Sequence, residues 1–157
     1  EFYTPKNGWM VQSNSAREAY RHTAGAWEIY YQEGTFTPTL YGVTTAGSHT
    51  YSVQSGWYRK IGSVIVIGAR VTLSAKDAAM AGDVRMSGLP FLPGSPVPCA
   101  TIALSFATAL PTFQAYAIHG SAAISLVKQA YNSGWVRVDA ADIGDSTSIQ
   151  VAVSFNL

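Results

Sequence analysis

Charge is scarce in this sequence and evenly balanced. Only 12% of the 157 residues are Asp, Glu, Lys or Arg, about half the usual share. Ten basic residues oppose nine acidic ones, and neither sign forms a block. The sequence therefore gives no indication of a basic surface for nucleic acid, and we expect no nucleic-acid partner.

Long hydrophobic runs and paired cysteines are also missing. The richest apolar run, Val64 to Ala69, is soon followed by Arg70, so no membrane insertion is expected. The single cysteine, Cys99, excludes an intrachain disulfide, and we expect a small buried residue there.

Residues that would support catalysis or metal binding are few and scattered. His22, His49 and His119 have no Cys or His partner at ligand spacing, so no metal and no cofactor are expected. The only local acidic cluster is Asp139, Asp142 and Asp145. It lies in or beside a predicted turn, where aspartate caps the backbone or faces solvent. A calcium site and a catalytic carboxyl pair are the less favoured interpretations. We therefore predict a protein that is not an enzyme.

Period-two patterns fill the chain beyond residue 33. Thr35, Thr37 and Thr39 alternate with Phe36 and Leu40, and Pro38 indicates a strand at a sheet edge or at the start of a sheet. The most apolar strand is expected within 63–73, where Gly68 indicates a bulge or a close backbone approach. Further strands are expected at 83–87, 100–107, 112–119, 122–128, 134–138 and 146–155. Eight to ten short strands predict an all-β fold, an antiparallel, jelly-roll-like β-sandwich.

Core positions follow from the same alternation. Phe36 shares a face with Leu40, and Tyr51 with Val53, and these residues are expected in the core. Val84 and Met86 are expected on one face of their strand. The proline-rich segment 88–98 is predicted to be a crossover whose Leu89, Phe91 and Leu92 fill the core.

The first 33 residues form an expected N-terminal arm or linker, with the β-sandwich spanning 34–157. Ser15 and Glu18 match a helix capping box. Ala16, Tyr20, Ala24, Trp27 and Tyr31 recur at helical spacing, which predicts a helix of about four turns. An irregular linker in an oligomeric stem is the alternative.

Three motifs carry a family resemblance. They are Gly34-Thr-Phe-Thr-Pro-Thr-Leu40, then Thr50-Tyr-x-x-Gln-x-Gly-x-Tyr-x-Lys-Ile-Gly62, and Ser87-Gly-Leu-Pro-Phe91. Together they resemble the C-terminal domain of tailed-bacteriophage tail fibres and tailspikes, over residues 33–157. The resemblance implies a homotrimer in the virion tail that binds a host cell-surface polysaccharide, lipopolysaccharide or capsule, during adsorption.

Exposed aromatic rings are the expected sugar contacts. A sugar lays its apolar C–H face on such a ring, which offers a large contact area at modest entropy cost. Trp57, Tyr131 and Trp135 lie near predicted turns and are the candidate glycan-binding residues. Two alternatives stay open, a purely structural trimerisation and folding cap and, less favoured, a glycan depolymerase. In the resembled family, glycan cleavage usually belongs to an upstream domain.

Overall fold

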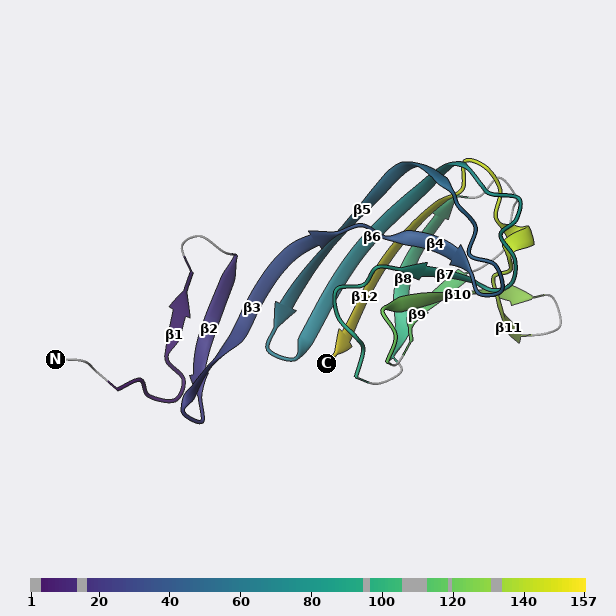
Figure 1. Ribbon diagram of the computed structural model, residues 1–157. Coiled ribbons are helices and arrows are strands. Elements are labelled where there is room, and N and C mark those ends of the chain that lie inside the picture. The colour runs from purple at the N-terminus through teal and green to yellow at the C-terminus, as the bar shows by residue number, and fades with distance from the viewer. Residues whose placement is uncertain (1–3, 14–16, 95–96, 106–112, 119, 131–133) are drawn as a thin grey trace.

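The computed structural model is almost entirely β-structure (Figure 1). It describes residues 4–13, 17–94, 97–105, 113–118, 120–130 and 134–157. Its strands are β1 (Met10–Gln12), β2 (Glu18–Thr23), β3 (Ala26–Phe36), β4 (Thr39–Gly42), β5 (Thr50–Ile61), β6 (Val64–Ala75), β7 (Val84–Ser87), β8 (Val97–Ser105), β9 (Phe113–Ala117), β10 (Ala123–Ala130), β11 (Gly134–Arg137) and β12 (Ser148–Asn156). One 3-10 turn, η1 (Ala140–Asp142), is the sole helical element among the described residues.

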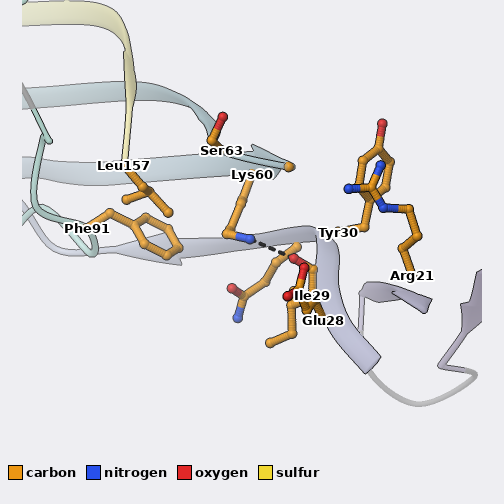
Figure 2. Close-up of a pocket in the computed structure, with 10 residues that line it drawn as sticks. Arg21, Glu28, Ile29, Tyr30, Lys60, Ser63, Phe91 and Leu157 are labelled. Atoms are coloured by element: carbon orange, nitrogen blue, oxygen red, sulfur yellow. Dashed lines mark hydrogen bonds between the residues drawn. The ribbon is translucent and has the colours of Figure 1, made fainter. Parts of the chain in front are cut away.

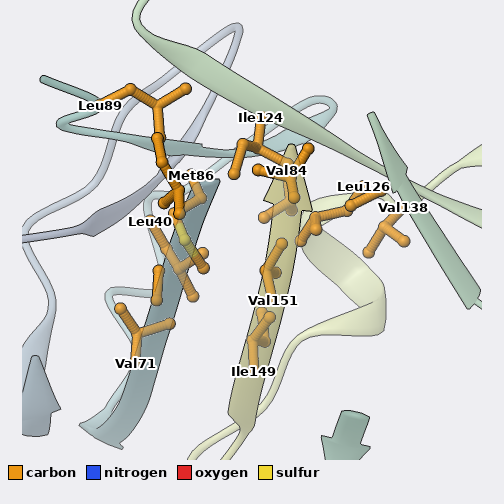
Figure 3. Packing of buried hydrophobic residues seen from close by; sticks show 14 of the residues in the cluster. Leu40, Val71, Val84, Met86, Leu89, Ile124, Leu126, Val138, Ile149 and Val151 are labelled. Carbon is orange, nitrogen blue, oxygen red and sulfur yellow. The ribbon is translucent and has the colours of Figure 1, made fainter. Parts of the chain in front are cut away.

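The strands pair in one antiparallel path that doubles back to form a sandwich. The order is β1-β2-β3-β5-β6-β12-β8-β9-β10-β7-β4, with β11 attached to β10. One layer contains β5, β6 and β12, and β4, β7 and β10 pack across it (Figures 1 and 3). The all-β antiparallel sandwich is thus confirmed. The single strand expected through residues 35–40 is wrong, because the chain leaves β3 after Phe36 and β4 begins directly after Pro38. β4 itself is at an edge of the path, as expected for a strand beside a proline.

The core lies between these layers and is built mainly by alternation along the strands. On β6, Ile65, Ile67, Val71 and Leu73 are buried, and the β12 side chains facing the same way are buried with them. Figure 3 shows Val71 and the β12 residues Ile149 and Val151 opposite side chains of β4, β7 and β10. Each fully buried aliphatic side chain contributes about 1.5–3 kcal/mol to stability, so this layer contact dominates the fold.

Most of the predicted core residues are inside. Leu40, Val84, Met86 and Leu89 are buried, whereas Phe36, Tyr51 and Phe91 are partly buried against the cluster. The prediction for Leu92 is wrong, because its side chain is 55% exposed. The chain leaves the strand at Gly88, where φ is +93°, and beyond that turn the alternation of β7 no longer determines which side chains face inward. The side chain of Cys99 lies outside what the structure describes.

The N-terminal helix and the irregular linker are both wrong over residues 18–32, where the chain forms β2 and part of β3. β2 and β3 form a hairpin in this region, with Ala24 and Gly25 as a two-residue turn. Both have positive φ, 50° and 88°, which suits the right-handed twist of a hairpin. The aromatic and β-branched residues after the turn favour strand, and the helical spacing is coincidental. Ser15, the predicted cap, lies outside the described residues.

Strand β3 connects this hairpin to the sandwich without a break. Its residues 26–32 pair with β2, and Tyr31–Phe36 pair with β5. We call β1, β2 and the β2-paired part of β3 the arm, which projects beyond the sandwich in Figure 1. The expected boundary between residues 33 and 34 falls inside β3.

Candidate functional site

Three aromatic rings each cover a glycine on the neighbouring strand. The paired residues are Gly34 and Tyr58, Phe36 and Gly56, and Trp57 and Gly68. A Cβ added at any of these glycines would overlap the partner ring. Because glycine has no side chain, each ring can approach the backbone of the next strand.

Trp57 differs from the other two rings because it faces outward. It lies in the middle of β5, between the inward-facing Gly56 and Tyr58, and it is 46% exposed. The turn expected next to it is absent. Its indole covers Gly68, which confirms the close approach predicted there, while the bulges of β5 lie near Tyr51 instead. Trp57 is therefore a large exposed ring that packs against the backbone of the sheet at Gly68.

A hollow of about 170 Å³ opens on one side of the indole. We call it the Arg70 hollow. Trp57, Ser55, Arg70 and Gln150 contribute side chains to it, and its floor is formed by small residues and backbone of β6 and β12. Ser55, Arg70 and Gln150 are direct cross-strand partners on β5, β6 and β12, so their side chains form a row. The Arg70 side chain has no hydrogen bond or ion pair with any described residue.

A second hollow of about 180 Å³ lies on the other side of Trp57, and we call it the Glu33 hollow. The Glu33 carboxylate accepts a 2.7 Å hydrogen bond from the Tyr31 hydroxyl. It is also 3.3 Å from Arg59 Nε and 3.4 Å from an Arg17 guanidinium nitrogen. The Tyr31 hydrogen bond above all, aided by both arginines, lowers the pKa of Glu33. Glu33 is therefore an anion with its charge already balanced.

A hollow of about 740 Å³ lies between the arm and the sandwich (Figure 2). Arg21 and Tyr30 line it from the arm, and Phe91 and Leu157 line it from the sandwich. The Arg21 guanidinium lies 4.8 Å from the centre of the Tyr30 ring. Lys60 Nζ donates a 2.7 Å hydrogen bond to the carbonyl of Ile29 and so ties the two parts together.

Of the other predicted site residues, the structure describes Trp135, and it lies away from Trp57. Trp135 is also well exposed, at 47%, but it lies on β11 and pairs with Gln129 of β10. It lines neither hollow beside Trp57. Tyr131, like His119, lies outside the described residues.

The three clustered aspartates have structural roles, as predicted. The Asp139 carboxylate caps η1 by accepting a 3.0 Å hydrogen bond from the Ala141 amide. Asp142 accepts one from the Asp139 amide and forms an ion pair with Lys128. Asp145 accepts a 2.7 Å hydrogen bond from the amide of Lys76. Within the described residues, no three His, Cys, Asp or Glu side chains gather as a metal would require.

The sequence indicated Trp57 but not its neighbours. Ser55, Arg70 and Gln150 come from strands far apart in the chain, and only the register places them in one row. The sequence did allow one neighbour to be predicted. Residues two apart in a strand lie on the same face, so Arg70 shares a face with Gly68. In the part of the chain that the structure describes, no helix is long and apolar enough to cross a membrane.

Comparison with known proteins identifies the fold. No family model matches the chain, and no curated protein matches its sequence. Among solved structures, it is similar to the crystal structure of the Dettilon tailspike protein (gp208), with a TM-score of 0.64. The match covers 80% of this chain at 16% identity, and it spans only 24% of that tailspike chain. Since identity this low is informative about architecture alone, the conclusion is that the chain has a tailspike-like β fold.

Proposed function

We propose that this chain is a non-enzymatic module of a phage tail fibre or tailspike that binds a host cell-surface glycan through Trp57. The observation behind the proposal is the exposed indole held over Gly68 between two polar hollows. The tailspike-like fold supports a place in the virion tail. Lipopolysaccharide or capsule is the expected partner.

The arrangement suits a sugar chain. A sugar ring can stack its apolar face on the indole, while its hydroxyls meet the amide, hydroxyl and guanidinium groups on either side. Each hollow has the volume of about six water molecules, taking about 30 Å³ per water, which is enough for part of a sugar unit. Two such hollows along one face would hold successive units of a polysaccharide.

Self-assembly is the second part of the proposal, and the arm supports it. Alternation and register place Trp9, Val11, Trp27 and Ile29 on one face of the arm, together with His22, whose ring packs edge-on against Trp27. All but the histidine are exposed. A small sheet with an open apolar face gains too little from burial to be stable alone in water. A second copy of the chain would cover it, in keeping with the homotrimer that the family resemblance implies.

Glycan cleavage is not part of the proposal. Glycosidases place two carboxyl groups across the bond that they break. The described residues that line the two hollows include one carboxylate, that of Glu33. It accepts a hydrogen bond from Tyr31 and forms ion pairs with Arg17 and Arg59.

The test combines mass with binding. Light scattering at two concentrations a hundredfold apart should give a stable mass near three chains. Immobilised bacterial lipopolysaccharides and capsular polysaccharides then report binding by wild type and by Trp57→Ala. We expect at least one polysaccharide to bind and Trp57→Ala to lose at least tenfold in affinity with its mass unchanged. Trp135→Ala tests the second predicted contact separately.

The outcomes separate the alternatives. A trimer that binds none of the polysaccharides would support the structural cap and refute glycan recognition. A monomer at both concentrations would refute assembly through the arm. Release of reducing ends from a bound polysaccharide would favour the depolymerase.

A further inference from the structure

We infer that the glycan bound at Trp57 is acidic, and that Arg70 binds its carboxylate or phosphate group. This inference rests on the proposed function, because it specifies the ligand class of the same site. It depends on three observations, namely the lack of a partner for Arg70, the distribution of charge around Trp57, and the row of polar groups beside Arg70.

Arg70 is a cation without a counter-ion in the described structure. Its side chain is exposed on β6 and lines the Arg70 hollow, where it meets no carboxylate. The other arginines beside Trp57 are engaged, since Arg17 and Arg59 both contact Glu33. A planar guanidinium that presents free N–H groups matches the paired oxygens of a carboxylate or phosphate.

The charge around Trp57 is locally positive, although the whole chain is almost neutral. Three arginines and one carboxylate line the two hollows, whereas the net charge of the chain is +1. The excess of positive charge therefore lies where the ligand is proposed to bind. Such a field attracts an anionic polymer and gives little advantage to a neutral one.

The spacing allows one sugar unit to use both Trp57 and Arg70. The indole covers Gly68, and Arg70 follows two residues later on the same face of β6. That step is about 7 Å along a strand, comparable with the size of one pyranose and its exocyclic acidic group. A ring stacked on the indole can thus direct its anionic group at the guanidinium.

Ser55 and Gln150 complete the contact. They are the direct cross-strand partners of Arg70 on either side, and both line the same hollow. Their hydroxyl and amide groups can hydrogen-bond the hydroxyls next to the acidic group. An ion pair alone would accept any anion, whereas this row gives the site a preference for an acidic sugar.

The experiment compares each acidic polysaccharide with its own neutral form. Hexuronic-acid polysaccharides are tested before and after reduction of the carboxyl groups to alcohols. Phosphate-substituted polysaccharides are tested before and after removal of the phosphate. Affinity is measured for wild type, Arg70→Gln, Trp57→Ala and Arg137→Gln. The last variant removes an equal charge from β11, where Arg137 pairs with Asp83.

We expect neutralisation of one of the two acid types to weaken binding by wild type about tenfold or more, which is typical of a lost charge-assisted hydrogen bond. Arg70→Gln should bind the acidic and neutral forms equally, and as weakly as wild type binds the neutral form. Arg137→Gln should keep the full preference. Which acid type responds identifies the group as carboxylate or phosphate.

Two results would overturn the inference while leaving the proposed function intact. One is binding that depends on Trp57 but is unchanged by both neutralisations, and the other is an acid preference that persists in Arg70→Gln. The proposed function itself fails if wild type binds none of the polysaccharides, or if Trp57→Ala binds as well as wild type.

Discussion

The indole of Trp57 covers the backbone of its cross-strand partner Gly68, and the Arg70 and Glu33 hollows lie on either side of the ring. The position of the ring therefore depends on a residue that has no side chain. Substitution at Gly68 can therefore displace the ring without removing any of the polar side chains that line the two hollows.

Gly68→Ala should displace the ring and leave the fold intact. The three atoms nearest to the added Cβ would all belong to the indole of an exposed side chain, which can rotate away, and φ at Gly68 is not positive. We expect a change in the free energy of unfolding within about 1 kcal/mol. Glycan affinity should fall by about as much as in Trp57→Ala. Tryptophan fluorescence tests whether the Trp57 ring has moved, and urea unfolding tests whether stability is kept. Unaltered fluorescence would contradict the prediction.

Gly42→Ala should be much more damaging, although its backbone φ is also not positive. The added Cβ would overlap the carbonyl oxygens of Ala81 and Thr45. Those two residues are fixed by a reciprocal pair of 3.1 Å backbone hydrogen bonds, so neither can move aside easily. We expect a loss of about 1–3 kcal/mol in the free energy of unfolding, as for other overpacked sites. A urea midpoint equal to that of Gly68→Ala would count against this explanation.

Asp77 should make stability depend on acid. Its carboxylate accepts hydrogen bonds from the amides of Ala79, at 2.9 Å, and Ser48, at 2.7 Å, and these bonds lower its pKa from 3.8. A carboxyl whose pKa is lower in the folded state stabilises the fold above the unfolded value. That contribution is lost as the pH falls through the folded pKa. Wild type should therefore exceed Asp77→Asn in stability by a constant amount from pH 7 to about pH 4. The difference should shrink below that pH in urea unfolding, whereas a gap that widens in acid would show the opposite linkage.

The ion pair between Lys128 and Asp142 should show strong coupling. Both side chains are mostly buried, and Asp142 also accepts a hydrogen bond from the Asp139 amide. Lys128→Met should cost about 1–3 kcal/mol, because it leaves a poorly solvated carboxylate without its cation. Lys128→Met combined with Asp142→Asn should lose less than the sum of the single variants. A double-mutant cycle measures this coupling, and strict additivity would mean that the pair is only a surface contact.

The sequence predicted the sandwich well because its signals there are local. The alternation in β7 and β12 marks these strands to within a few residues. It failed in the arm, where aromatic residues happened to recur at helical spacing. The stronger signal was Gly25 after Ala24, which permits a two-residue hairpin turn.

The candidate site could be predicted only in part. Trp57 was identified by its chemistry, but Arg70, Ser55 and Gln150 become its neighbours through strand register, which depends on the whole sheet. The same limit applies to Trp135, whose chemistry resembles that of Trp57 but whose strand joins the other layer. Residue type thus indicated both tryptophans as candidates. Only the pairing of distant strands shows that Trp57, and not Trp135, lies beside Arg70, Ser55 and Gln150.

The unbroken course of β3 has a mechanical consequence. Tension applied through the arm would enter the sandwich along β3, parallel to the strand and across its pairing with β5 from Tyr31 to Phe36. The hydrogen bonds of an antiparallel pair lie perpendicular to the strands, so such a load shears all of them together and does not peel them one at a time. Under a pull along this axis, the connection between arm and sandwich is therefore a stiff, load-sharing joint, unlike a hinge.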